Sequence, residues 1–450
     1  MHDFVLMRLL RYARNDSMVY CIITPTPMPD LEAPAATVVT LENVEQAARR
    51  LKGVIAKTPL LQNLGLSRTY DATILLKRED LQVVRSYKIR GAYNKIATLP
   101  TTVPSRQIVC ASAGNHAQGV AYACQLLGLQ GDIFMPAQTP AQKVDKVRLF
   151  GKDMVTVHLT GRTFDDCYHA AQAFCDERGS TFVHPFDDLA IVEGQATVGL
   201  EILKSAKEQI DFCFMPIGGG GLASGLSSVF RQLSPNTRLI GVQPLGAPSM
   251  HDALRAGQRQ ALPSLDTFVD GAAVKCPGEL TFEICQALLD EVHLVPEGQV
   301  CEDLLKMYNE EGMVLEPAGT LAISALHAYA DQIRGKTVVC IVSGSNNDIT
   351  RMEDIKERAQ RHQGLKHYFM VRFNQAPGAL RRFVNNVLAE GEDIIQFQYI
   401  KKNNKEKGPV FIGVEVRQRG DEADIMARMA AEGFGYEYLN GQQDFLSLLI

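Results

Sequence analysis

The chain has 450 residues, of which 46% are hydrophobic and 22% charged, enough for a substantial core divided over two or three compact units. Its net charge is −5 with acidic and basic residues intermixed, so we expect neither nucleic acid nor a membrane as a partner. Ten cysteines occur without CxxC pairs or a Cys/His spacing typical of a metal site, and reduced thiols in the cytoplasm fit this usage.

Residues 1–35 are predicted to form a flexible N-terminal extension. Apolar and arginine positions at near-helical spacing in residues 1–17 raise the alternative of a targeting peptide. Asp3 and Asp16 disfavour it, as does the missing small-residue cleavage site. The proline-rich remainder of the extension is typical of a flexible leader.

Residues 36–350 alternate between short β-branched runs and amphipathic helical segments, which predicts an α/β fold built from strand–helix–strand units. Most of the predicted strands are continuously apolar, as in a sheet covered on both faces. The clearest helices are predicted at 115–128, 162–177 and 297–312, each with an apolar stripe. The predicted strands lie within 73–78, 108–112, 131–135, 153–159, 182–186, 212–221, 238–244 and 337–344.

A separate C-terminal module is predicted over residues 365–450. The charged and amide-rich segment 351–364 before it is typical of a surface helix that leads into a linker. The module's pattern of apolar runs and turns gives the order βαββαβ, which describes a ferredoxin-like α+β sandwich of one sheet and two helices. Its strands are predicted within 367–373, 394–402, 410–416 and 436–439, and its helices within 379–391 and 423–433.

Three turns at strand ends carry small residues suited to binding an anion. SAGNHAQGVAYA (112–123) follows a strand and opens a helix, where free backbone amides attract a carboxylate or phosphate; the alternative is a tight turn with Asn115 as a helix cap. GGGGLASG (218–225) lets main-chain amides surround a phosphate, unless it is merely a flexible loop. VSGSNND (342–348) ends a strand with hydroxyls and amides, although Ser343 alone would be read as a helix N-cap.

The glycine run is not a nucleotide fingerprint, since it has neither the spaced glycines of a dinucleotide site nor a following GK[ST]. Lys88, in SYKIRGA, would by itself be read as a solvated surface charge. Its significance comes from the motifs that accompany it.

Seven segments in this order resemble the fold-type-II pyridoxal-phosphate (PLP) enzymes, and among them the threonine dehydratases: SYKIRGA, SAGNHAQGVA, HPFDD, GGGGLASG, GVQPLGAPSM, EPAGT and SGSNND. The resemblance covers about residues 40–350 and implies two open α/β lobes like those of the tryptophan synthase β subunit. The C-terminal module resembles the single ACT-like regulatory domain of the short biosynthetic threonine dehydratases.

The resemblance also implies roles for individual residues. Lys88 would bind the cofactor aldehyde covalently and later act as the base on the substrate's Cα proton. Asn115 would hydrogen-bond the ring hydroxyl, and Ser343 would face the pyridine nitrogen. The phosphate would be held by Gly218, Gly219, Gly220, Gly221 and Leu222, and the substrate carboxylate by Ser112, Ala113, Gly114 and Asn115.

Three positions, Ala113, His116 and Ser345, distinguish this chain from relatives. Serine racemases that resemble it have a second serine at Ala113, so racemisation is expected to be slow, and Ala113 and His116 also argue against sulfhydrylases and cystathionine synthases. Ser345 replaces the small residue of the usual SGGN or SGAN. Glu316, in EPAGT, is expected either to approach the cofactor ring or to be a plain helix cap.

The implied activity is dehydration and deamination of L-threonine to 2-oxobutanoate and ammonia, with L-serine as a secondary substrate and isoleucine as the feedback inhibitor. A homotetramer is expected by resemblance. The alternatives are a catabolic serine/threonine dehydratase of broader specificity and a non-catalytic amino-acid sensor. A third alternative makes the C-terminal module only a dimerisation domain.

Overall fold

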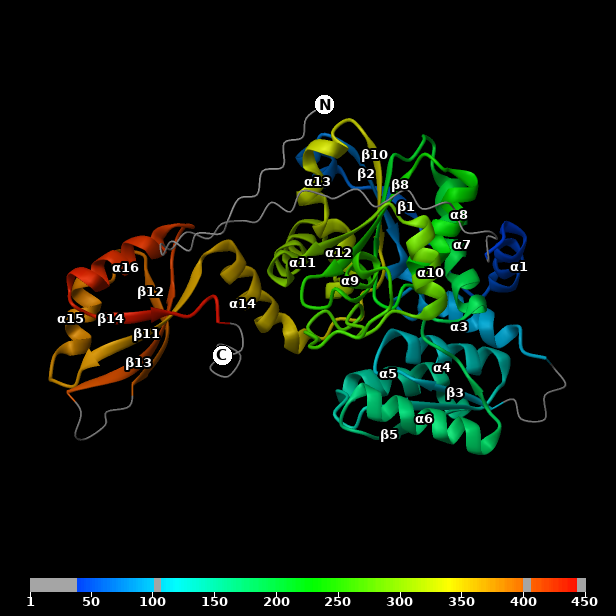
Figure 1. Cartoon of the computed structure of the whole chain (residues 1–450), viewed down its shortest axis with the longest axis horizontal. Helices are drawn as coiled ribbons and strands as arrows, with labels where there is room; N and C mark the ends of the chain where they lie inside the picture. The colour runs from blue at the N-terminus through cyan, green and yellow to red at the C-terminus, as the bar shows by residue number, and fades with distance from the viewer. Residues whose placement is uncertain (1–38, 101–106, 400–405, 443–450) are drawn as a thin grey trace, which may run out of the picture. The chain divides into compact units, whose positions relative to one another are not determined.

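A computed structural model describes residues 39–100, 107–399 and 406–442 of the chain (Figure 1). The predicted N-terminal extension of residues 1–35 lies outside these ranges. Within them, no helix combines the length and the apolar character needed to cross a membrane.

The largest sheet has six strands in the order β1-β2-β10-β7-β8-β9, all parallel except for the antiparallel edge strand β1. The prediction missed both edge strands, β1 and β9. The strands are β1 (Leu60–Gln62), β2 (Thr73–Arg78), β7 (Phe212–Pro216), β8 (Arg238–Pro244), β9 (Glu291–Val295) and β10 (Thr337–Val342).

A second, parallel sheet has four strands in the order β5-β4-β3-β6. The predicted strand 182–186 is wrong beyond Phe182, because the His184 ring accepts the backbone N–H groups of Phe186 and Asp187 and turns the chain out of the sheet. The strands are β3 (Ile108–Ala111), β4 (Gly131–Met135), β5 (Val155–Leu159) and β6 (Thr181–Phe182). The helices of this lobe are α4 (Asn115–Leu127), α5 (Ala141–Gly151) and α6 (Phe164–Arg178).

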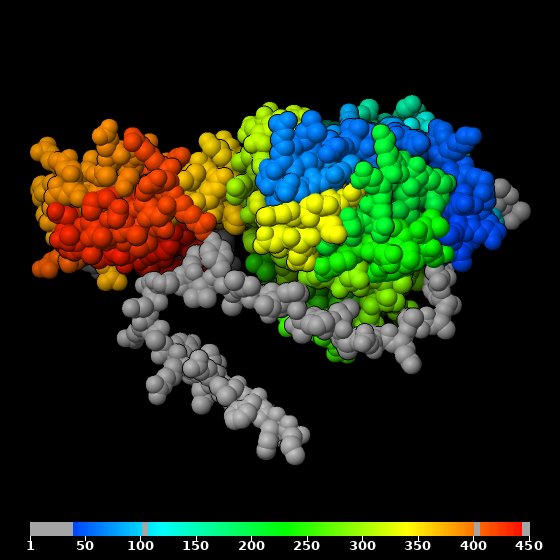
Figure 2. Space-filling model, turned by 90° about the horizontal axis from the view of Figure 1, so that it is seen from above, coloured from blue at the N-terminus to red at the C-terminus, as the bar shows by residue number. Residues whose placement is uncertain are grey.

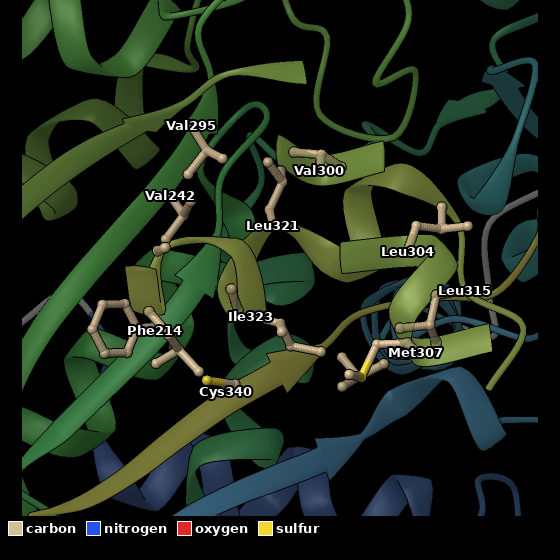
Figure 3. Packing of buried hydrophobic residues seen from close by; sticks show 14 of the residues in the cluster. Phe214, Val242, Val295, Val300, Leu304, Met307, Leu315, Leu321, Ile323 and Cys340 are labelled. Atoms are coloured by element: carbon tan, nitrogen blue, oxygen red, sulfur yellow. The ribbon is translucent and has the colours of Figure 1, made fainter. Parts of the chain in front are cut away.

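The six-stranded sheet is buried on both faces, as its apolar strands predicted. Along β10, Cys340 belongs to one core cluster and its neighbours Val339 and Ile341 to another. Figure 3 shows the first cluster, where Phe214 and Val242 of the sheet meet apolar side chains from the covering helices. The helices of this lobe are α1 (Leu41–Leu51), α2 (Leu64–Tyr70), α7 (Leu189–Ser205), α8 (Gly221–Leu233), α9 (Ser249–Ala256), α10 (Glu279–Leu288), α11 (Glu297–Glu311), α12 (Pro317–Ser324) and α13 (Leu326–Ile333). Helix α3 (Lys88–Ala97) instead packs its apolar residues into the core of the four-stranded lobe.

The first and last segments of the six-stranded lobe lie side by side at its surface. In Figure 2 the blue surface of the early segment adjoins the yellow surface of the late one. Helices α2 and α13 meet there, and the rings of Tyr70 and His327 pack edge to face with centroids 5.9 Å apart. The first strands of the chain therefore join the sheet beside β10, one of the last.

The C-terminal module is a ferredoxin-like sandwich with the strand order β12-β13-β11-β14, entirely antiparallel. Segment 351–364 forms helix α14 (Met352–Gln363), whose Ile355 and Ala359 are buried in the core of the six-stranded unit. The module's elements are β11 (Lys366–Asn374), α15 (Ala379–Asn386), β12 (Asp393–Tyr399), β13 (Lys407–Glu415), α16 (Asp421–Ala431) and β14 (Gly435–Tyr438). This confirms the predicted order.

Candidate active site

Lys88 is the first residue of α3, and its amine is partly buried. Nζ donates a hydrogen bond to the Pro185 carbonyl at 2.9 Å and lies 5.4 Å from the centroid of the Tyr87 ring. Burial lowers the pKa of Lys88 to about 8, although the nearby carboxylate of Glu316 acts in the opposite direction. The alternative of a solvated surface lysine is therefore wrong.

Helix α3 is held in place by buried ion pairs that the prediction missed. Arg90 is fully buried and donates to both carboxylate oxygens of Glu79 and to both of Glu201, at 2.7–2.9 Å. Burial by itself would raise the pKa of Glu79, but the Arg90 guanidinium beside it lowers that pKa below its usual value. The network fixes the backbone two residues after Lys88.

The tetraglycine turn joins β7 to α8. Gly220 has a φ of +100° and is the N-cap of α8, with no side-chain cap hydrogen bond. A Cβ on Gly219 would collide with the Phe186 ring, and one on Gly221 would lie 3.0 Å from the Phe186 carbonyl oxygen. The turn thus offers uncapped helix N-terminal amides, the arrangement that binds phosphate well.

The lysine and the turn meet through one short segment. Pro185 accepts the hydrogen bond from Lys88 Nζ, and the next residue, Phe186, packs against Gly219 and Gly221. Leu222 is buried in the core of the six-stranded unit, so only its backbone is suited to face a ligand. The Lys88 amine and the tetraglycine turn therefore both contact the Pro185–Phe186 segment.

Asn115 is not a helix cap. It is the first residue of α4, Gly114 holds the N-cap position, and the Asn115 amide donates to Glu316 Oε1 at 2.7 Å. Its oxygen accepts from Asn346 Nδ2 at 2.7 Å. Asn346 lies in the quoted motif SGSNND but was given no role, because amides of a loop carry no signal of which partner they meet.

The other predicted substrate residues lie in the turn between β3 and α4. The Ser112 hydroxyl accepts the N–H of Gly114 at 3.2 Å, and the Ser112 backbone N–H donates to Phe134 O at 3.0 Å. Ser112, Ala113 and Gly114 are only partly buried. The turn precedes the uncapped N-terminus of α4, and a carboxylate is favoured at such a position.

Ser343 follows the end of β10 and is 3% exposed. Its hydroxyl donates to Ala318 O at 3.3 Å, and it caps no helix, so the cap alternative is wrong. Ser345 has hydrogen-bond partners in the loop: its hydroxyl donates to Asp80 O at 3.2 Å and its backbone N–H to Arg85 O at 2.9 Å.

Glu316 occupies the N-cap position of α12 but makes no side-chain cap hydrogen bond, so the cap interpretation is wrong. Its carboxyl instead meets Asn115, and a Cβ on Gly344 would collide with it. Burial, followed by the charge of Asp270, raises the pKa of Glu316 to about 7. The carboxyl is thus poised to change protonation near neutral pH.

Two histidines near Lys88 are held neutral. Burial, with a contribution from the charge of Lys88, lowers the pKa of His116 to about 3, and its Nε2 lies 2.9 Å from Val183 O. Burial lowers the pKa of His184 to about 4, and its Nδ1 accepts backbone N–H groups. Neither ring carries a charge at neutral pH, so Lys88 and Glu316 are the groups here that titrate near it.

Family models match two parts of the chain. One described as a pyridoxal-phosphate-dependent enzyme matches residues 51–344, and one described as the C-terminal regulatory domain of threonine dehydratase matches residues 357–449. The chain belongs to the threonine dehydratase family of PLP-dependent enzymes.

Relatives and solved structures agree with this assignment. The biosynthetic L-threonine dehydratases of Halalkalibacterium halodurans and Bacillus subtilis are 48% and 47% identical over 92% of this chain and 99% and 98% of their own lengths. The structure of the processed form of threonine deaminase isoform 2 from Solanum lycopersicum has a TM-score of 0.67 at 37% identity, covering 75% of this chain and 98% of that one. The serine racemase of Dictyostelium discoideum has a TM-score of 0.64 at 29% identity, over 69% of this chain and 100% of that one.

The lowered pKa of Lys88 predicts how apoprotein captures PLP. Only the neutral amine attacks an aldehyde, so the capture rate is expected to rise about tenfold per pH unit below pH 8 and to level off above it. Stopped-flow absorbance between pH 6 and pH 10 measures this profile. A rate that keeps rising to pH 10, as for an exposed lysine, would contradict the buried environment.

Proposed function

We propose that this enzyme converts L-threonine to 2-oxobutanoate and ammonia as the first step of isoleucine biosynthesis, with L-serine as a secondary substrate. One observation carries the proposal: the partly buried Lys88 amine lies next to the segment that packs on the tetraglycine turn, in a chain 46–48% identical to biosynthetic L-threonine dehydratases.

The residues present fit PLP. The amides of Gly218–Leu222 would hold the phosphate, Asn115 the ring hydroxyl and Ser343 the ring nitrogen. The uncapped start of α8 supports the phosphate position, and the close packing of Gly219 and Gly221 against Phe186 leaves no room for side chains in the turn. When bound, PLP supplies an aldehyde that captures amines and a ring that withdraws electrons from the substrate's Cα.

Lys88 would perform the proton transfer. The free Lys88 amine would remove the substrate's Cα proton, and its pKa of about 8 keeps part of it neutral under physiological conditions. The proton taken up by Lys88 would then pass to the β-hydroxyl, which leaves as water. The released product hydrolyses in water to the 2-oxo acid and ammonia.

The polar groups around Lys88 would set orientation and reaction type. The turn of Ser112, Ala113 and Gly114 with the start of α4 would bind the substrate carboxylate, which supports placement of Cα near Lys88. Ser343 offers a hydroxyl and no carboxylate, so it does not favour a protonated ring nitrogen, and this suits rapid elimination. Ala113 provides no donor for reprotonation from the opposite face.

The C-terminal module would bind isoleucine and report the level of the pathway's end product. It contains a hollow of about 190 Å³ at the start of α15, whose lining includes Arg372, Arg382 and Phe434. Arginine suits the carboxylate of an amino acid, and an apolar ring suits its side chain. A homotetramer and a cytoplasmic location complete the proposal; the nine cysteines within the described ranges are all free thiols.

The activity is tested by 2-oxo acid formation from L-threonine, L-serine and D-serine, with and without added PLP. We expect L-threonine to react best, L-serine more slowly and D-serine not measurably. Lys88→Ala should lower turnover at least about 100-fold. Lys95→Ala, on the same helix but paired with Asp188, should retain it. Equal use of L-serine would favour the catabolic alternative, and bound PLP without turnover would favour the sensor.

Isoleucine titration of full-length enzyme tests regulation. Arg372→Ala is expected to raise the isoleucine concentration for half-inhibition about tenfold or more, because a charge-assisted hydrogen bond is lost. Arg381→Ala, an exposed arginine of α15 that does not line the hollow, is the control. If isoleucine has no effect on the wild-type enzyme, the regulatory proposal fails and the dimerisation alternative gains.

A further inference from the structure

Four side chains from separate segments form one continuous hydrogen-bonded chain. Lys146 Nζ donates to Asn346 Oδ1 at 3.0 Å. Asn346 Nδ2 donates to Asn115 Oδ1 at 2.7 Å, and Asn115 Nδ2 donates to Glu316 Oε1 at 2.7 Å. The four residues come from α5, the loop after β10, the start of α4 and the N-cap of α12.

The Lys146 end of this chain fixes its direction, because an ammonium group only donates hydrogen bonds. At the other end, the ionised form of Glu316 accepts from Asn115 Nδ2. Rotating the Asn346 amide by 180° would set its NH₂ against Lys146, and rotating Asn115 would set its oxygen against Glu316. The Asn346 amide is fixed a second time, since its Nδ2 also donates to Val84 O at 2.8 Å.

The direction of the chain decides what Asn115 offers to a ligand. Its oxygen accepts from Asn346 and one of its N–H groups is given to Glu316, which leaves one N–H without a hydrogen-bond partner among the described residues. Asn115 is therefore presented as a donor. A donor stabilises an oxygen that has lost its proton better than one that retains it.

We infer that Asn346 and Lys146 are positioning residues that orient the Asn115 amide, so that Asn115 donates to the cofactor's ring oxygen and favours its deprotonated form. The inference rests on the proposed function, in which Asn115 contacts that oxygen. Neither Asn346 nor Lys146 touches the cofactor in this account; they act through Asn115.

Helix α5, which carries Lys146, is held against the six-stranded lobe by a second lysine. One turn earlier, Lys143 Nζ lies 2.6 Å from Asp270 Oδ2, so two lysines of one helix face bind loops of the six-stranded unit. Lys146 and Asn115 belong to the four-stranded lobe, whereas Asn346 and Glu316 belong to the six-stranded one. The orientation of Asn115 thus requires contacts between both lobes.

The test uses full-length holoenzyme and two loop variants. Asn346→Asp keeps an acceptor for Lys146 but has no N–H for Asn115, and Asn346→Ala removes both. Each is expected to shift the absorbance of bound PLP from the longer-wavelength, deprotonated form toward the shorter-wavelength form. Each should also weaken PLP binding about two- to tenfold, the value of one hydrogen bond. Asn347→Ala, which removes a neighbouring amide that does not contact Asn115, should change neither.

Lys146→Met provides a second variant that does not depend on the loop, since Lys146 is only partly buried. It should shift the spectrum in the same direction, whereas Arg148→Met on the same helix should not. Wild-type spectra and PLP affinity in Asn346→Asp, Asn346→Ala and Lys146→Met would overturn the inference, while continued threonine turnover would leave the proposed function intact. A wild-type chain that binds no PLP would instead overturn the proposed function.

Discussion

The close approach of helices α3, α4 and α7 is the constraint on which the site depends. A Cβ on Gly119 of α4 would lie 3.2 Å from the Lys88 carbonyl, and one on Gly194 of α7 would lie 2.6 Å from the Arg90 carbonyl oxygen. Only glycine lets these backbones approach so closely. The approach buries the N-terminal end of α3, and this burial lowers the pKa of the Lys88 amine.

Burying a charged side chain costs free energy, and the ion pairs of Arg90 on α3 offset this cost. Arg90 is fully buried, and an unpaired charge there would be strongly destabilising, on the order of 3–5 kcal/mol. Glu79 precedes α3 and Glu201 lies on α7, so pairing the arginine ties the helix to both neighbours. The ion pairs thus fix the position of α3, the helix that carries both the paired charge of Arg90 and the amine of Lys88.

The sequence predicted the structure best where a residue pattern is compatible with only one local structure. Strands such as β2 and β8 were predicted at their observed bounds because continuous apolar runs suit a sheet covered on both faces. The short edge strand β1 and the alternating β9 lack that signal. Arg90 and Asn346 were missed because the identity of a polar side chain does not reveal a partner more than 100 residues away. The tetraglycine turn was recognised because four glycines leave few structural alternatives.

The central claim is that the amine of Lys88 captures a cofactor whose phosphate sits in the tetraglycine turn. Its most direct test is borohydride reduction of PLP-loaded enzyme, followed by peptide mass spectrometry to locate the reduced cofactor on the chain. The account predicts a single stoichiometric pyridoxyl modification on Lys88. Modification of a different lysine, with Lys88 recovered unmodified, would contradict it.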